Sequence, residues 1–160
     1  MGKSQNLFEK KCWNPLQHRS WRVALGFVSV VAALGLYGAC SSKASGEFVA
    51  SGGELGEWTF KPNKCNSGQR QGFFGVWLKK KGDKKHFVKV AKDPATGKTV
   101  VTVGIPGTKK GLVLKSCKVL KSTIRKTNTT INDIRCVEGS VEVDCPSAKF
   151  KGKAKFENCH

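Results

Sequence analysis

Acidic residues and catalytic motifs are scarce in this sequence. It has 29 lysines and arginines but only 11 aspartates and glutamates, which gives a formal net charge of +18. It has three histidines, and we find no G-x-S-x-G, H-E-x-x-H or phosphate-binding loop. We therefore expect a non-catalytic protein without a cofactor, whose partners carry negative charge.

Metal-binding spacing is also missing. Cys136, Cys145, Cys159 and His160 could together supply thiolates and an imidazole, but no C-x₂₋₄-C pair and no C-x-x-C-H is present. Outside the cytoplasm, oxidation competes for the same thiols. We expect no metal site, and a small Cys/His metal protein or enzyme stays open as an alternative.

The sequence has one uninterrupted apolar run, which extends from Val23 to Cys40. Five bases and one acid precede it, and small residues follow its apolar core. A positive segment, an apolar core of about 7–15 residues and a small-residue site together are typical of an export signal. A spanning helix needs about 20 residues, so the core is short for one.

The end of this run resembles the lipobox of bacterial lipoprotein precursors. Gly38, Ala39 and Cys40 fit that pattern, while Tyr37 stands where the family usually has Leu. The resemblance covers the first 40 residues only. It implies that residues 1–39 are a signal peptide and that Cys40 is acylated. Because Ser41 is not an aspartate, it also implies passage to the outer membrane.

Two other fates remain open for this segment. Cleavage after Ala44 would release a soluble secreted protein that starts at Ser45. Alternatively, the run is not cut and stays as an anchor. Each fate places residues 45–160 outside the cytoplasm.

Residues 41–53 are rich in Ser, Gly and Ala and show no apolar periodicity. With Cys40 they predict a lipidated, flexible tether over 40–53, followed by one domain over 54–160.

That domain is predicted to be all-β, an antiparallel sandwich or open barrel of about seven or eight strands. Short apolar runs alternate with Gly, Pro, Asn and Asp, and no helical periodicity follows Cys40. Three strands over 73–80, 84–91 and 98–104 form a meander, with a two-residue turn at Gly82-Asp83. A second hairpin is predicted at Glu138-Gly139, which would place Cys136 opposite Val141.

Five cysteines follow Cys40, and in an oxidising compartment they indicate disulfides with one cysteine left over. We predict that Cys65 bonds with Cys117 and that Cys145 bonds with Cys159. Cys136 would then be a buried, reduced thiol, because alternation places it inward beside Ile134. The alternative pairs Cys136 with Cys117 and leaves Cys65 exposed.

Lysine clusters are the predicted polyanion-binding residues. One set surrounds the Gly82-Asp83 turn and the other alternates with apolar residues near the end of the chain: Lys79, Lys80, Lys81, Lys84, Lys85, and Lys149, Lys151, Lys153, Lys155. A period of two places the second set on one face of a strand. For the second set taken alone, we favour the explanation that the lysines protect an edge strand against aggregation.

Together these observations predict a membrane-anchored envelope lipoprotein with a polyanionic partner: lipopolysaccharide, a wall polymer or extracellular DNA. Lysine greatly outnumbers arginine, which favours diffuse attraction over specific nucleic-acid recognition. The alternative is a structural or protein-interaction lipoprotein whose charge serves solvation. An aromatic contribution to binding, from Trp58 or Trp77, is a further hypothesis.

Overall fold

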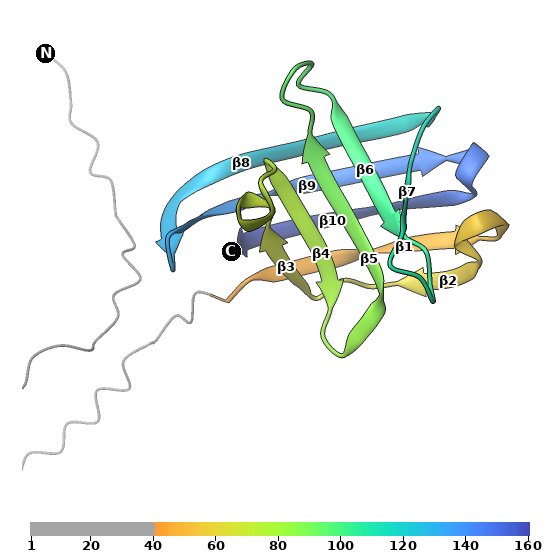
Figure 1. Cartoon of the computed structure of the whole chain (residues 1–160), viewed down its shortest axis with the longest axis horizontal. Coiled ribbons are helices and arrows are strands. Elements are labelled where there is room, and N and C mark those ends of the chain that lie inside the picture. Colours follow the sequence, from red (N-terminus) through yellow and green to blue (C-terminus); the bar gives the residue numbers. More distant parts are fainter. Residues whose placement is uncertain (1–40) are drawn as a thin grey trace, which may run out of the picture.

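Two five-stranded antiparallel sheets pack face to face in the computed structural model, which describes residues 41–160 (Figure 1). Sheet A has the strand order β2-β1-β10-β9-β8, and sheet B has the order β3-β4-β5-β6-β7. The strands are β1 Lys43–Ser51, β2 Glu57–Phe60, β3 Lys64–Ser67, β4 Gly75–Lys80, β5 Asp83–Lys92, β6 Thr99–Gly104, β7 Gly111–Val113, β8 Val119–Ile131, β9 Ile134–Cys145 and β10 Phe150–Cys159. Three short 3₁₀ turns, η1 Gly53–Leu55, η2 Gln69–Gln71 and η3 Pro146–Ala148, lie in the connections.

The predicted all-β sandwich is confirmed, and the two sheets do not close into a barrel. Alternating apolar residues form the core, because a period of two turns every second side chain inward. Four phenylalanines of sheet A and a set of valines of sheet B are almost fully buried there: Phe48, Phe60, Phe150, Phe156, Val76, Val88, Val90, Val101 and Val103. The predicted meander is present as β4, β5 and β6.

The predicted tether over residues 41–53 is wrong. Lys43–Ser51 is strand β1, which lies between β2 and β10 and pairs with both. Phe48 in this strand is 0% exposed, and its ring stacks on Phe150 with the ring centroids 5.7 Å apart. The small residues that resemble a linker allow close approach between strands. A Cβ on Gly46, for example, would lie 2.2 Å from the carbonyl oxygen of Lys153. The described domain therefore begins almost at Cys40.

The predicted hairpin at Glu138-Gly139 is also wrong. The turn is Asn132-Asp133, where φ is 48° and 62°, and it joins β8 to β9. Asn and Asp tolerate this left-handed conformation, which two-residue hairpin turns require. Gly139 lies inside β9, opposite Ile124. Val141 therefore pairs with Ser122 and Ala154 and not with Cys136.

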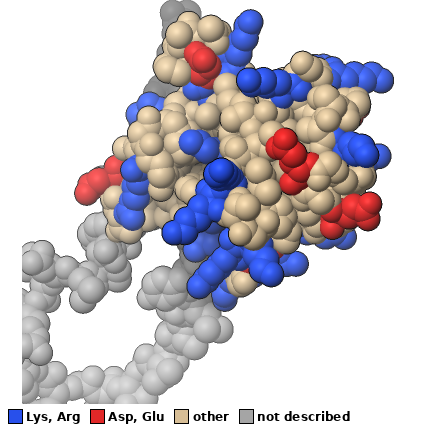
Figure 2. All heavy atoms as spheres, turned by 45° about the vertical axis from the view of Figure 1, so that its right-hand side comes forward, with Lys and Arg blue, Asp and Glu red and all other residues tan. Residues whose placement is uncertain are grey.

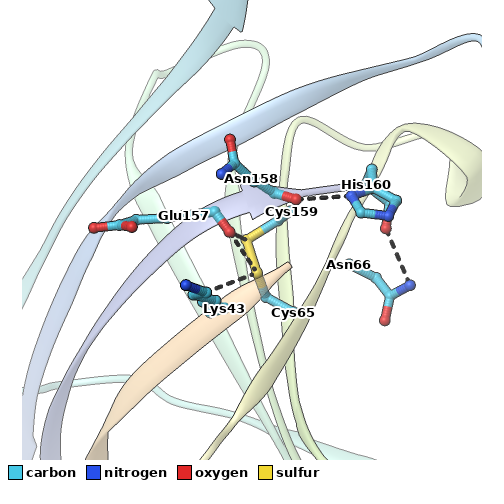
Figure 3. The surroundings of a disulfide bond; sticks show 7 residues. All are labelled: Lys43, Cys65, Asn66, Glu157, Asn158, Cys159 and His160. Carbon is cyan, nitrogen blue, oxygen red and sulfur yellow. Dashed lines mark hydrogen bonds between the residues drawn. A yellow bond between two sulfur atoms is a disulfide. The ribbon is translucent and has the colours of Figure 1, made fainter. Parts of the chain in front are cut away.

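Four cysteines form two disulfides, as predicted, but the predicted pairing is wrong. The bonds are Cys65–Cys159 and Cys117–Cys145. Figure 3 shows the first bond at the end of β10, where the main-chain oxygen of Lys43 lies 3.3 Å from the Cys65 sulfur. The sequence could not reveal that β3 of sheet B crosses the ends of β1 and β10 in sheet A. That crossing places Cys65 beside Cys159.

Cys136 is a free, buried cysteine, as predicted. Burial raises the pKa of its thiol. It lies where the β8–β9 register shifts, and its main-chain carbonyl accepts a hydrogen bond from the Thr127 hydroxyl at 3.3 Å. Its thiol is therefore protonated and sheltered at neutral pH.

Candidate anion-binding face

The basic and acidic residues of the domain are distributed unequally between the two sheets. The five strands of sheet B contain seven lysines and a single acid, Asp83. The five strands of sheet A contain eight bases and six acids. Figure 2 shows one face of the molecule, on which Lys and Arg project widely and Asp and Glu are fewer. The excess positive charge of the strands therefore belongs mainly to sheet B.

Lys64 and Lys79 lie directly opposite one another on β3 and β4. Their neighbours Cys65 and Leu78 point into the core, so both lysines face outward from sheet B. Within residues 41–160, the ion pairs are Lys61–Glu47, Arg125–Glu138 and His86–Asp83, and neither Lys64 nor Lys79 takes part in one. Like charges directly opposite on one face destabilise a sheet.

The pKa of Lys79 reflects this arrangement. Partial burial lowers it, and the positive charge of Lys64 lowers it further. Both effects disfavour the charged form of the ammonium group. An anion placed between the two lysines would oppose both effects, because a nearby negative charge favours the ammonium form.

Aromatic rings lie beneath ammonium groups on the same face. The Lys79 ammonium is 4.4 Å from the ring centroid of Trp77, and the Lys89 ammonium is 3.9 Å from that of Phe73. Trp77 also contacts Phe87 edge to face, with the centroids 5.3 Å apart. Cation–π attraction holds the two ammonium groups over the rings. We call the outward-facing Lys64, Trp77, Lys79, Phe87 and Lys89 the lysine face.

The cation–π contacts bear on whether Trp77 or Trp58 could stack against a bound ligand. A base or sugar that stacked on Trp77 would have to displace the Lys79 ammonium. Trp58, the other predicted candidate, packs within the fold. Its indole N–H donates to the Leu55 carbonyl at 2.7 Å, and its ring lies against His86 with the centroids 5.0 Å apart. The geometry thus favours binding through charge over binding by stacking.

The β4–β5 hairpin holds the other predicted lysines of the first set. Its turn residues are Lys81-Gly82, one position before the predicted turn, because Lys80 pairs with Asp83. Lys80, Lys81, Lys84 and Lys85 are exposed.

Asp83 organises this hairpin. Its carboxylate accepts hydrogen bonds from the backbone N–H of Lys85 at 2.8 Å and of His86 at 3.1 Å, and it contacts the His86 ring at 2.8 Å. Partial burial alone would raise the pKa of Asp83, but these hydrogen bonds hold it below its usual value. The single acid of sheet B is thus engaged locally and does not neutralise Lys64 or Lys79.

The second predicted set of lysines has different surroundings. Lys153 lies opposite Glu47 on one side and Glu142 on the other, and Lys151 lies opposite Asp144. Opposite charges across strands stabilise a sheet. β10 is flanked by β1 and β9, so the interpretation of these lysines as edge protection is wrong.

Lys149 does not belong to the row. It caps η3 with a φ of 49°, one residue before β10 begins. Lys155 faces outward between Ser45 and Ser140, without an acid directly opposite. The structure therefore brings Lys79 together with Lys64 and Lys89 on sheet B, and it places Lys151 and Lys153 opposite acids on sheet A.

Sequence reasoning did not select Lys64, Lys89 or Arg70. Lys89 could have been found, because alternation along 84–91 turns Phe87 and Lys89 away from Val88 and Val90. Lys64 could not have been found in this way, because the Asn, Ser and Gly residues over 66–72 indicate a loop, and a loop has no predictable face.

No group of three or more Cys, His, Asp or Glu side chains suited to a metal occurs within residues 41–160. In the same range, no helix is long and apolar enough to cross a membrane. Cys40 and the predicted signal over 1–39 lie outside the described residues. Comparison of the chain with protein-family models, curated proteins and solved structures gives no match.

Proposed function

We propose that this chain is a non-catalytic lipoprotein of the bacterial envelope, anchored through an acylated Cys40, that binds a polyanion through the lysine face. The observation that carries the proposal is the direct opposition of Lys64 and Lys79 without an acidic partner. In sheet A of the same protein, Lys153 instead lies directly opposite an acid on each neighbouring strand. Repulsion between two directly opposed lysines destabilises the sheet. A bound anion would remove this repulsion, which explains why the protein has both lysines at the cost of some stability.

The side chains indicate the class of partner. Lysine is a hydrated point charge and makes no planar bidentate contacts. It therefore binds phosphate or carboxylate groups regardless of the monomer sequence of the polymer that carries them. The Trp77 and Phe73 rings already contact ammonium groups, which argues against stacking of bases. Lipopolysaccharide, a wall polymer and the backbone of extracellular DNA all meet this description.

Heparin retention of the detergent-extracted protein tests the binding face. We expect Lys64→Gln/Lys79→Gln to elute at clearly lower salt than the parent, because fewer counterions are released on binding. Lys151→Gln/Lys155→Gln removes the same charge from sheet A and serves as the matched control. Equal shifts for the two variants would mean that net charge alone acts, as in a structural lipoprotein with a solvated surface.

Intact-mass analysis of the membrane-extracted protein tests the anchor. The expected mass is that of a chain beginning at Cys40 with acyl chains attached. Cys40→Ala should block processing or release the protein from the membrane. A Cys40→Ala variant that migrates and fractionates as the parent does would refute the anchor.

A further inference from the structure

The chain enters the fold beside the opposed lysines. The Lys43 main-chain oxygen lies 3.3 Å from the sulfur of Cys65, which directly follows Lys64 (Figure 3). Ser42, Lys64 and Arg70 line one polar cavity of about 180 Å³. Its other described lining residues are Asn66, Ser67, Gln71, Asn132, Ile134 and His160, so no acidic side chain of residues 41–160 borders it. Lys64 and Arg70, which form no ion pair within the described residues, therefore lie close to the beginning of β1.

Covalent geometry limits how far this point can lie from an acylated Cys40. Ser41 and Ser42 alone separate Cys40 from the first residue of β1. Three steps of about 3.8 Å allow at most about 11 Å between the two Cα atoms. A flexible tether over 41–53 would instead have given a separation of roughly 20 Å. Charges interact over a Debye length of about 8 Å at physiological salt. Because no flexible tether separates Cys40 from β1, Lys64 and Arg70 lie near enough to the membrane surface to interact with its charge.

We propose that the polyanion bound by Lys64, Arg70 and Lys79 is the anionic headgroup layer of the membrane that holds the acyl chains of Cys40. This inference rests on the proposed lipid anchor. Lipid phosphates supply the negative charge that the Lys64–Lys79 pair lacks within residues 41–160. An acyl anchor combined with a basic patch is a stronger membrane signal than either alone, and it fixes the orientation of the domain.

The structure supplies an internal control for this orientation. Lys151 lies opposite Val49, six residues along β1 from Lys43. At about 3.4 Å per residue this places it roughly 20 Å from the anchored end, beyond the reach of the headgroup charge. Lys64 and Lys151 should therefore respond differently to the same membrane.

The test uses the processed protein reconstituted into vesicles of phosphatidylcholine, with or without phosphatidylglycerol. Amine acetylation is followed at single lysines by mass spectrometry. We expect Lys64 and Lys79 to react roughly five-fold more slowly in the anionic vesicles, which corresponds to about 1 kcal/mol per lysine near such a surface. High salt should abolish the difference, and Lys151 should react at one rate throughout. Arg70→Gln should reduce the protection of Lys64, whereas Lys151→Gln should leave it unchanged.

Equal acetylation rates of Lys64 and Lys79 in the two kinds of vesicle would overturn the inference. A further experiment, in which heparin is added to the phosphatidylcholine vesicles, distinguishes failure of this inference from failure of the proposed function. Protection by heparin without protection by phosphatidylglycerol would mean that the lysine face binds a soluble polyanion and not the membrane. Protection by neither would refute polyanion binding as well.

Discussion

Cys65 and Cys159 lie 94 residues apart in the sequence and are joined by a disulfide that ties β3 of sheet B to β10 of sheet A. The second bond, Cys117–Cys145, spans only 28 residues. A cross-link that closes a longer loop removes more entropy from the unfolded chain. The two disulfides should therefore differ in their contribution to stability.

We predict that Cys65→Ala/Cys159→Ala lowers the free energy of unfolding by roughly 4–5 kcal/mol, and that Cys117→Ala/Cys145→Ala lowers it by roughly 3.5 kcal/mol. Denaturant unfolding of the oxidised proteins measures both values. A larger loss for the second pair would contradict the chain-entropy explanation. Peptide mapping without reductant checks the pairing itself, and a peptide that links Cys65 to Cys117 would contradict the structure.

Phe48 tests whether β1 belongs to the core. It is fully buried, and its ring packs against those of Phe60 and Phe150. We expect Phe48→Ala to lower the free energy of unfolding by about 3–5 kcal/mol. Phe74→Ala is the control, because Phe74 is 39% exposed and should cost about 1 kcal/mol or less. Equal, small losses would restore the interpretation of residues 41–53 as a tether.

Gly139 tests the close approach of β8 and β9. Its φ is 152°, and a Cβ there would lie 1.8 Å from the carbonyl oxygen of Thr123. Gly139→Ala must break local β8–β9 pairing, and we expect a loss of about 3 kcal/mol in the free energy of unfolding.

Gly72→Ala provides the comparison, since Gly72 also has a positive φ of 72° but no atom within 4 Å of the added Cβ. It should lose only the roughly 1–2 kcal/mol of a left-handed alanine. If Gly139→Ala were the milder change, the close approach to Thr123 would be wrong.

Asp83 predicts a pH dependence of stability. Its pKa is below the usual 3.8 because of its hydrogen bonds to His86 and Lys85, which outweigh the effect of burial. Folding thus favours the ionised carboxylate of Asp83. Its contribution to the stability of the folded protein is complete above the usual pKa and is lost as the pH falls through the lower pKa of the folded state. The Asp83 side chain keeps 23% of its surface exposed, and screening by solvent limits the effect to about 1 kcal/mol or less.

Asp83→Asn isolates this contribution. The variant should be less stable than the parent near neutral pH, and the two should converge below about pH 3. Thermal unfolding across this range provides the measurement. A difference that grew as the pH fell would have the wrong sign for a depressed carboxyl pKa.

Local chemistry in the sequence was enough to determine the structural class. The alternation in 73–80 and 98–104 predicted strands because a period of two follows from the backbone of any strand. The burial of Cys136 was predicted from the same alternation, although its supposed partner Val141 was wrong. Oxidation of the other four cysteines followed from their number and the predicted compartment.

The tertiary structure alone decided which residues lie opposite one another. Residues 41–53 read as a linker because their composition carries no sign of the neighbours β2 and β10, whose backbones hold β1 in the sheet. Cys65 bonds with Cys159 because β3 of one sheet lies beside the end of β10 of the other. Lys64 lies opposite Lys79 because of the register between β3 and β4. Lys151 and Lys153 of β10 lie directly opposite acids, whereas Lys64 of β3 lies directly opposite another lysine, because the residue across the ladder is set by how the strands assemble.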